Sequence, residues 1–217
     1  NPSIIVAIAG IETFYGTHQG RNNTLNALAS LAFHYPKRAA FFQKELASYF
    51  LLNQKIPLAH VKSSYAGAIG IPQFMPSTYL HYAVSAHPQH QPQLMSNHDD
   101  AIFSIANYLK QHGWQRNQFI VVPAITKYKP DQKWFFKKPT KTISWYHARN
   151  IKPEWPLETK QPAFLIKLNT RHESPYWLAL PNFYSLLRYN PRINYAMAVY
   201  SLSRALQHEM DHVRRSA

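Results

Sequence analysis

One carboxylate stands out near the start of the chain, in the apolar stretch Ala-Ile-Ala-Gly-Ile-Glu-Thr-Phe-Tyr-Gly at residues 7–16. Helical spacing puts Glu12 on the face that also carries Ile5, Ile8 and Tyr15. Low-polarity surroundings raise the pKa of a carboxyl, which suits a general acid near neutral pH. The alternative is structural: this acid meets a Lys or Arg, or points into water. The residues alone leave both interpretations open.

The other nine acids supply no obvious partner for Glu12. A two-carboxylate glycosidase needs a second acid flanking the scissile bond. None of the nine lies in a clearly apolar predicted helix, and Asp99 and Asp100 fit the first turn of a helix, where the dipole favours carboxylates. Sugar chemistry here would therefore use a single carboxyl. The nine are Glu45, Asp99, Asp100, Asp131, Glu154, Glu158, Glu173, Glu209 and Asp211.

A competing signal is the segment His208-Glu209-Met210-Asp211-His212, which matches the HExxH pattern of zinc peptidases. Each histidine lies two residues, or about 200°, beyond an apolar stripe residue (Leu206 or Met210), so we expect both to face solvent. A catalytic zinc also needs a third protein ligand, and only five residues follow. We favour a solvated polar helix face, and we predict no metal and no other cofactor.

Basic and aromatic residues alternate between Lys127 and Lys141, where lysines flank the run Trp134-Phe135-Phe136. The pattern has three interpretations: stacking on the bases of single-stranded nucleic acid, stacking on sugar rings, or packing of a small lobe with its lysines reaching outward. The packing interpretation requires no ligand, and we favour it.

The chain is strongly basic, with 24 Lys and Arg against 10 Asp and Glu and a formal net charge of +14. This balance indicates an anionic partner, such as nucleic acid, anionic lipid or an acidic cell-wall polymer. The absence of cysteine excludes disulfides and thiolate metal sites. No apolar run approaches the roughly 18 residues of a membrane span, and no cleavable leader is evident. The abrupt start at a helical pattern leaves an upstream leader, anchor or domain open.

Helical patterns dominate the first half of the sequence and the end of the chain. Between them, residues 63–76 hold too many glycines and prolines for a regular element, so we predict a shaped loop, and residues 85–96 read as a solvated loop. The helix signals are Gly16 ending a helix over 3–15, Thr24 as a cap, Pro36 in a first turn, Pro76 restarting a helix, Asn97 or Ser96 as a cap, Gly113 as an end, and a final helix after Pro191.

From about Phe119 to Leu180 the pattern changes to short β-branched or aromatic runs separated by prolines. We therefore predict an α+β fold that is mainly α. Its parts are a helical lobe over 1–114, a strand-rich insert over 115–175, and C-terminal helices over 176–217 that complete the first lobe. The predicted strands are Phe119 to Val122, Thr142 to Tyr146 and Phe164 to Leu168.

Five segments, taken in order, resemble the membrane-bound lytic transglycosylase B family. They are Ile8 to Gly16 (IAGIETFYG), Leu25 to Arg38 (LNALASLAFHYPKR), Ser63 to Ser77 (SSYAGAIGIPQFMPS), Ala106 to Trp114 (ANYLKQHGW) and Tyr176 to Val199 (YWLALPNFYSLLRYNPRINYAMAV). The resemblance implies a lysozyme-like helical fold and an enzyme that cleaves the β-1,4 bond between N-acetylmuramic acid and N-acetylglucosamine in peptidoglycan.

In this family one glutamate protonates the leaving oxygen and then acts as base while the muramoyl 6-hydroxyl closes on C1, which leaves a 1,6-anhydro ring. The matching residue is Glu12. An intramolecular nucleophile replaces the second carboxylate, in agreement with the acids of this sequence. The matching positions imply six further site residues: Ser64 and Gln73 on acetamido and hydroxyl groups, Tyr189 and Asn190 at the cleaved bond, and Tyr108 and Tyr195 lining the cleft.

The sequence departs from the family in several places. Many relatives carry an acid-rich, EF-hand-like calcium loop, whereas residues 84–95 hold no acid, so we expect no calcium site. Pro72 replaces a glycine-type residue before Gln73, and the insert over 115–175 matches weakly. Family members also have residues before the catalytic helix, so we expect this chain to be truncated at its start.

The resemblance implies a monomeric periplasmic enzyme that binds peptidoglycan glycan strands, has no nucleic-acid partner, and has in its full-length form an outer-membrane anchor outside this chain. The basic surface would be drawn to the carboxylate-bearing wall. Two alternatives remain open: a lysozyme-type hydrolase that admits water, and a non-catalytic module that binds cell wall or nucleic acid.

Overall fold

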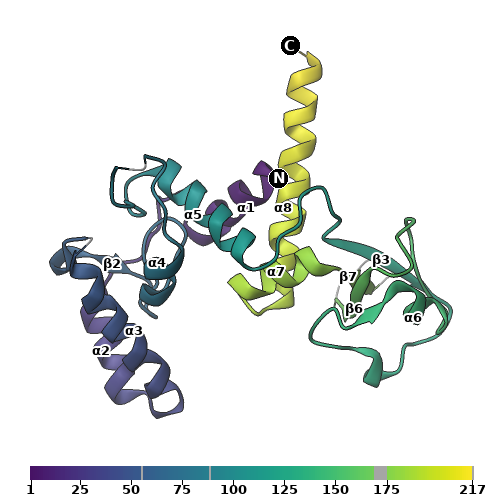
Figure 1. Cartoon of the computed structure of the whole chain (residues 1–217), viewed down its shortest axis with the longest axis horizontal. Helices are drawn as coiled ribbons and strands as arrows, with labels where there is room; N and C mark the ends of the chain where they lie inside the picture. The colour runs from purple at the N-terminus through teal and green to yellow at the C-terminus, as the bar shows by residue number, and fades with distance from the viewer. Residues whose placement is uncertain (55, 88, 169–174, 217) are drawn as a thin grey trace. The chain divides into compact units, whose positions relative to one another are not determined.

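The computed structural model divides into two compact units (Figure 1). We call residues 2–108 and 202–217 the helical unit, and residue 1 with residues 109–201 the sheet unit. Helices predominate, and a five-stranded antiparallel sheet lies in the sheet unit. The prediction of a mainly α, α+β fold is therefore confirmed. The structure describes residues 1–54, 56–87, 89–168 and 175–216.

In the helical unit α2 and α3 pack against each other as a hairpin, and α1, α4 and most of α5 belong to the same unit (Figure 1). Buried residues of the hairpin include Leu28 and Ala32 of α2 and Phe42 and Tyr49 of α3, at helical spacing. Its elements are α1 (Pro2–Thr13), β1 (Asn22–Asn23), α2 (Thr24–His34), η1 (Pro36–Arg38), α3 (Ala39–Leu51), η2 (Leu52–Gln54), η3 (Leu58–His60), β2 (Lys62–Ser63), α4 (Pro76–Tyr82) and most of α5 (His98–Gln111).

Two of the predicted helix ends are wrong in detail. α1 ends at Thr13, two residues early, because Phe14 and Tyr15 adopt left-handed backbone angles before Gly16 does. The cap of α2 is Asn23, whose side chain accepts a hydrogen bond from Asn26 N at 3.1 Å. Thr24 instead begins the helix and donates its hydroxyl proton to the carbonyl of Val61, 2.8 Å away.

Leaving aside residue 88, which lies outside the described residues, the loop over residues 83–97 is exposed along much of its length, as predicted, but the carboxylate of Asp100 also holds part of its backbone. This side chain, 1% exposed, accepts hydrogen bonds from Ala86 N at 2.8 Å, Gln93 N at 2.7 Å and Ser85 Oγ at 3.2 Å. The prediction that Asp100 serves only the helix dipole is therefore incomplete. Asn97 caps α5 as predicted, accepting from the backbone N–H groups of residues 99 and 100.

Burial and hydrogen bonding act in opposite directions on Asp100. Burial disfavours its charged form and would raise its pKa, but the hydrogen bonds from Ala86, Gln93 and Ser85 favour the carboxylate more strongly. His87 nearby adds a small favourable charge interaction. The net result is a pKa for Asp100 below its ordinary value.

The sheet unit centres on strands in the order β4-β6-β7-β3-β5, each antiparallel to its neighbour. Leu178 of the central strand pairs with Val122 on one side and Leu165 on the other, and all three are buried. The elements are β3 (Val121–Thr126), η4 (Gln132–Trp134), β4 (Lys141–Thr142), α6 (Ile143–His147), β5 (Ile151–Pro153), β6 (Pro162–Lys167), β7 (Tyr176–Ala179), α7 (Pro181–Tyr189) and the first part of α8 (Ile193–Ser216).

The strand predictions are only partly right. β6 overlaps the predicted strand but begins two residues earlier and ends one residue earlier. β3 begins two residues later and ends four residues later than predicted, and β5 and β7 were not predicted. The run predicted as a strand over 142–146 is mostly α6, because the hydroxyl of Thr142 accepts a hydrogen bond from Trp145 N at 3.3 Å and caps a helix.

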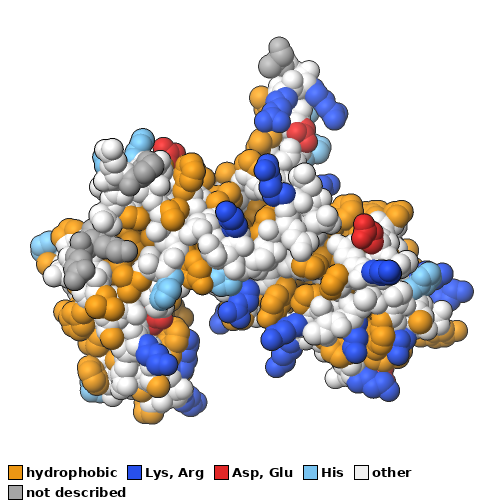
Figure 2. Space-filling view, in the orientation of Figure 1, with side chains coloured by type: hydrophobic (Ala, Val, Ile, Leu, Met, Phe, Trp, Pro, Cys, Tyr) orange, Lys and Arg blue, Asp and Glu red, His pale blue; other side chains and the backbone are white. Residues whose placement is uncertain are grey.

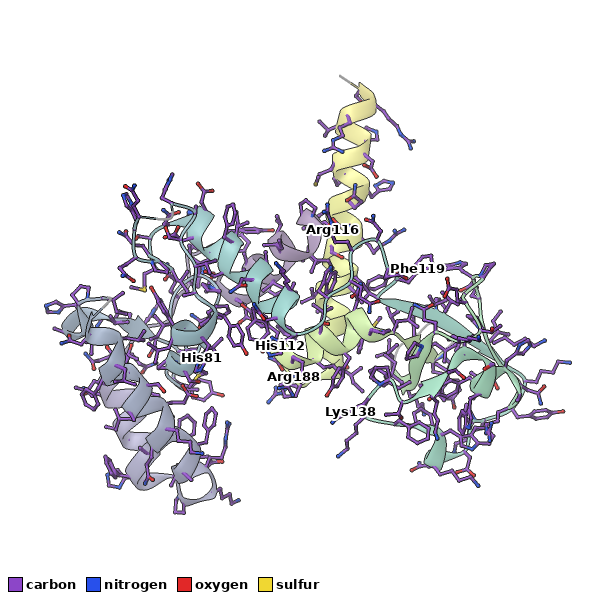
Figure 3. The ribbon with its side chains drawn as sticks, in the orientation of Figure 1. His81, His112, Arg116, Phe119, Lys138 and Arg188 are labelled. Carbon is purple, nitrogen blue, oxygen red and sulfur yellow. The ribbon has the colours of Figure 1, made fainter. Side chains whose placement is uncertain are left out.

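The alternating basic and aromatic segment packs the sheet unit. Trp134, Phe135 and Phe136 lie partly buried against its hydrophobic core. The ammonium of Lys141 lies 5.3 Å from the ring centre of Phe136, within cation–π range. The packing interpretation is confirmed, and the other lysines reach outward: the side chain of Lys138 points away from the sheet (Figure 3).

No helix in the described part of the chain combines the length and apolar character that crossing a bilayer requires.

Candidate active site

α1 is the element that positions Glu12. The helix buries Ile4, Ala7 and Ile8, so its last turn is held against the helical unit and carries a partly buried Glu12. The prediction that Tyr15 continues this helical face is wrong, because the helix has already ended. The ring of Tyr15 instead folds back over Gly10, where a Cβ atom would come 3.0 Å from the phenol.

The turn after Glu12 is strained and tightly held. Phe14 and Tyr15 have φ values of 48° and 58°, in the left-handed region, and such residues cost about 1–3 kcal/mol each. Three contacts hold this backbone in place: Gly16 N donates to Thr13 Oγ1 at 2.9 Å, Gln19 Nε2 donates to Gly16 O at 2.9 Å, and a ring nitrogen of His98 lies 3.0 Å from Tyr15 O. Non-glycine strain of this kind is concentrated at functional sites.

The 63–76 loop has the shaped, irregular backbone that its glycines and prolines predict. Ile69 and Phe74 exchange two backbone hydrogen bonds of 2.8 and 3.0 Å, which closes a tight hairpin around Gly70 and Gln73. Gly70 has φ of 72°, and a Cβ atom there would lie 2.7 Å from the carbonyl oxygen of Leu94. Only glycine allows this approach between the two loops.

Gln73 is oriented by the bonds that its amide makes. Its Nε2 donates to Gly70 O at 2.9 Å and to Gln19 O at 3.3 Å, so both amide protons are committed to carbonyl oxygens. Within the described residues, its Oε1 accepts no hydrogen bond. In this orientation Gln73 can bind a ligand by accepting a hydrogen bond at Oε1 from an N–H or O–H group.

Ser64 has the opposite polarity. Its Oγ accepts a hydrogen bond from Ala68 N at 3.1 Å, and its own N–H donates to Ala68 O at 3.0 Å. Among the described residues, nothing accepts the Ser64 hydroxyl proton. Ser64 is thus set to donate to a ligand oxygen, whereas Gln73 is set to accept.

Tyr108, on α5, lies deeper than a cleft-lining residue would. Only 7% of its surface is exposed, and its ring packs against Phe74 (centroids 5.7 Å apart) and edge-on against Tyr82 (4.9 Å). Phe74 follows Gln73 directly, so the Tyr108 ring supports the 63–76 loop from behind.

The remaining predicted residues lie in the sheet unit, at the junction of α7 and α8. Tyr189 ends α7, and its ring stacks on that of Tyr195 with centroids 6.3 Å apart and planes 11° from parallel. Asn190 stands between them in sequence, where its N–H closes α7 on Leu186 O at 3.1 Å and its Oδ1 accepts from Arg192 N at 3.3 Å.

Glu45 is an acid that sequence reasoning misjudged. It lies on the buried face of α3, three residues after Phe42 and four before Tyr49, and is 5% exposed. Its carboxylate accepts hydrogen bonds from Ser77 N at 2.9 Å and Ser77 Oγ at 2.6 Å, at the start of α4. Glu12 is therefore not the only acid in an apolar helix, and the spacing of Glu45 with Phe42 and Tyr49 could have revealed this. One turn along α4, His81 contacts Ser77 O (Figure 3).

A pocket of about 480 Å³ opens beside the turn that follows α1. Its wall combines backbone and side chains from three segments of the helical unit, and Gln19 links two of them by donating to both Gly16 O and Met95 O. The lining residues are Gly16, Thr17, Gln19, Gly20, Pro57, His60, Val61, Lys62 and Met95.

The HExxH residues face solvent, as predicted. The side chains of His208 and Glu209 are 80% and 76% exposed, and His212 is exposed as well. In the part of the chain that the structure describes, no three His, Asp or Glu side chains cluster as metal ligands would.

A family model described as the transglycosylase SLT domain matches residues 1–204. The chain belongs to this transglycosylase family. The match includes the insert over 115–175, where the motif resemblance was weak, and the family resemblance seen in the sequence is confirmed.

Similar proteins agree with this SLT-family assignment. The chain is 41% identical over 208 residues to membrane-bound lytic murein transglycosylase B of Escherichia coli (strain K12), covering 94% of this chain and 56% of that protein. It is 36% identical to the solved lytic transglycosylase SltB1 of Pseudomonas aeruginosa, with a TM-score of 0.90 over 95% of this chain and 69% of the other. These values also confirm the predicted lysozyme-like fold.

A second similar structure was solved with a ligand. SltB3 of Pseudomonas aeruginosa, in complex with NAG-anhNAM-pentapeptide, is 30% identical and gives a TM-score of 0.82, covering 94% of this chain and 56% of that one. The chain thus spans a little over half the length of the Escherichia coli relative and of SltB3.

Proposed function

We propose that this chain is a peptidoglycan lytic transglycosylase in which Glu12 alone serves as acid and then as base. The observation that carries the proposal is what the other acids of the helical unit do. Glu45 holds the start of α4 and Asp100 holds the 83–97 loop, so both carboxylates are already committed to hydrogen bonds.

The other acids of the described helical unit are Asp99, Glu209 and Asp211, on the first turn of α5 and on the last turns of α8. Asp99 and Glu209 are exposed, and Asp211 accepts from Gln207 Nε2 at 2.9 Å. Glu12 differs from these acids in its position: it is partly buried in the last turn of α1, a helix that buries Ile4, Ala7 and Ile8, and it directly precedes a strained turn. A single acid in such a place favours an intramolecular nucleophile over a water activated by a second carboxylate.

The proposed reaction needs one proton carrier. Glu12 donates its proton to the glycosidic oxygen as the bond between that oxygen and C1 of N-acetylmuramic acid breaks. The carboxylate then takes the proton of the 6-hydroxyl of the same sugar while O6 bonds to C1. Glu12 ends protonated again, no water is consumed, and the product carries a 1,6-anhydro ring.

The hydrogen-bond polarity of the site residues supports this substrate class. A 2-acetamido group offers both an N–H donor and a C=O acceptor, which match an accepting Gln73 and a donating Ser64. We keep Tyr189, Asn190 and Tyr195 as predicted substrate contacts, and the stacked pair Tyr189 and Tyr195 offers a flat apolar face of the kind that sugar rings contact. The proposed role of Tyr108 at the cleft is carried by the 63–76 loop, which its ring supports through Phe74.

Relatives and charge favour the same assignment. SltB3 was solved with an anhydro-muramoyl fragment, which is the product type proposed here. Lys and Arg side chains stand over the surface of the sheet unit (Figure 2), and a net charge of +14 suits a wall polymer that carries carboxylates.

We also propose the three-part organisation that the sequence suggests, with residues 115–175 as an insert between two parts of the catalytic lobe. The proposed location is the periplasm. An anchor outside this chain belongs to the same proposal, because the Escherichia coli relative is named as membrane-bound. We propose that the chain acts as a monomer.

The test compares the wild-type chain with Glu12→Gln on purified peptidoglycan, with products identified by mass spectrometry. We expect 1,6-anhydro muropeptides from the wild type and a loss of turnover of about 10³-fold or more in Glu12→Gln, because the substitution removes the only proton carrier. The matched control is Glu209→Gln, an exposed glutamate whose amide should leave turnover unchanged.

Two results would contradict the proposal. Reducing-end products one water heavier would mean a lysozyme-type hydrolase. Binding to peptidoglycan without release of any product, in both wild type and variant, would mean a non-catalytic binding module.

A further inference from the structure

The strongest unexplained feature of the helical unit is a buried hydroxyl directly after Glu12. Thr13 is 1% exposed, and its Oγ1 donates to the carbonyl oxygen of Ile71 at 2.9 Å. Thr13 Oγ1 also accepts a hydrogen bond from Gly16 N at 2.9 Å, so the hydroxyl acts as both donor and acceptor. The bond to Ile71 joins residues 58 positions apart in sequence.

This bond links the two segments that carry the proposed acid and the proposed substrate contact. Thr13 follows Glu12 by one residue, and Ile71 precedes Gln73 by two. On the far side, Ile71 N donates to Leu94 O at 2.8 Å, and Gly70 packs against the same carbonyl. The backbone that carries Gln73 is thus fixed from both sides, by Thr13 and by Leu94.

The Gly16 bond fixes the second half of the same junction. Gly16 N donates to the hydroxyl oxygen of Thr13, and Gln19 Nε2 donates to Gly16 O. Gln73 Nε2 in turn donates to Gln19 O. Together with the short backbone segments between them, these hydrogen bonds form a closed ring. It runs from Thr13 through Gly16 and Gln19 to Gln73, then along the backbone to Ile71, whose bond with Thr13 closes it.

We infer that Thr13 is a positioning residue that sets the place of Glu12 relative to Gln73 through its bonds to Ile71 and Gly16. The inference rests on the proposed function, because it takes Glu12 as the acid and Gln73 as a substrate contact. A shift of about 1 Å between a reacting group and its substrate can cost 10²-fold in rate, so a single buried hydrogen bond at this junction has kinetic weight.

Thr13→Val tests the inference, because valine keeps the branched shape and removes the hydroxyl. We expect kcat on peptidoglycan to fall about 10- to 100-fold, with a smaller change in KM. Thr13→Ser restores the hydroxyl and should recover most of kcat. Should Thr13→Val not fold, Thr13→Ala takes its place with the same expectation, assayed where circular dichroism shows it folded.

The chain offers a matched control. Thr24 is 0% exposed and donates its hydroxyl proton to the carbonyl of Val61, a long-range partner like Ile71, but this bond does not connect the segment of Glu12 with that of Gln73. Thr24→Val should lower the melting temperature to a similar extent and leave kcat within about twofold.

A coupling measurement separates positioning from general stability. If Thr13 acts through the placement of Gln73, the double variant Thr13→Val with Gln73→Ala should lose less activity than the product of the two single losses. A wild-type kcat in folded Thr13→Val, an equal loss of kcat in Thr24→Val, or fully multiplicative losses would overturn the inference. Activity retained by Glu12→Gln would instead overturn the proposed function.

Discussion

The two irregular loops of the helical unit meet at Leu94 but are held in different ways. The 63–76 loop is fixed by neutral hydrogen bonds from Thr13, Gln73 and its own backbone, and its glycines allow close approach. The 83–97 loop is organised around one charged group, the carboxylate of Asp100. The loop that carries the proposed contacts is thus held by neutral groups along its own length, with the Glu45 carboxylate bound only at Ser77 just beyond it. The supporting loop instead depends on an ionised acid within its own hydrogen bonds.

The difference separates two kinds of effect. Changes in the 63–76 loop should alter turnover, because they displace Gln73 and the backbone bonded to Thr13. Changes in the 83–97 loop should alter stability first, because they release backbone N–H groups of a supporting loop. The following substitutions test this division, from the largest expected effect to the smallest.

Gly70→Ala should have the largest effect. The left-handed φ of 72° costs an alanine about 1–2 kcal/mol, and its Cβ would stand 2.7 Å from the backbone oxygen of Leu94. We expect a total loss of at least about 2 kcal/mol in the free energy of unfolding, together with a loss of turnover, measured by urea denaturation and product release. The control is Gly113→Ala, which has φ of 85° but no atom within 4 Å of the new Cβ.

If the steric clash at the junction of the two loops matters, Gly70→Ala should lose clearly more free energy of unfolding and more turnover than Gly113→Ala. Equal losses from the two variants would show that backbone strain alone matters, and that the contact with Leu94 has no role.

Asp100→Asn should destabilise the chain by about 1–3 kcal/mol, because the amide cannot accept all the hydrogen bonds that the carboxylate accepts. The pKa of Asp100 is lowered in the folded state, so its contribution is fully present above about pH 4, the ordinary pKa of aspartate, and is lost as the pH falls through the lower folded value. Wild-type stability should therefore fall on acidification below pH 4, and that of Asp100→Asn should fall less.

Melting curves across this pH range, with exposed Asp99→Asn as the matched neighbour, check the prediction. A drop in kcat at neutral pH that exceeds the loss of folded protein would contradict a purely supporting role for the 83–97 loop.

Tyr79→Phe should have the smallest effect. The Tyr79 hydroxyl donates to the carbonyl of Pro92, at the far end of the 83–97 loop, and burial raises its pKa to about 12. Loss of one neutral hydrogen bond should cost about 1 kcal/mol in thermal or urea denaturation, with turnover unchanged. A larger loss of turnover in Tyr79→Phe than in Asp100→Asn would contradict this ranking of the two contacts.

Sequence reasoning predicted the elements whose signals are local. The end of α5 two residues before Gly113, the cap at Asn97 and the shaped backbone around Gly70 each follow from one residue type at one position. The short helix α6 did not follow, because a β-branched run gives the same pattern as a strand and only the cap by Thr142 decides between them.

The candidate site residues could be named from sequence motifs. The long-range contacts that hold them in place could not be predicted. Glu12 was a candidate from its apolar helix and then from a family motif, whereas Ser64 and Gln73 came from family motifs alone. The hydrogen-bond polarity of Ser64 and Gln73 came only from the structure. The partners of Asp100 are backbone N–H groups, and the bond from Thr13 to Ile71 spans 58 positions, so neither leaves a pattern in the sequence. The buried position of Glu45 did leave one, in its spacing with Phe42 and Tyr49.

The most direct test of a single-carboxyl mechanism is to digest purified peptidoglycan in ¹⁸O-labelled water and measure the masses of the products by mass spectrometry. If the Glu12 carboxylate accepts the proton of the 6-hydroxyl and O6, rather than water, attacks C1, the new muramoyl ends should be 1,6-anhydro sugars that carry no ¹⁸O. Reducing ends that carry one ¹⁸O atom would show that water is the nucleophile and would contradict the mechanism proposed for this chain.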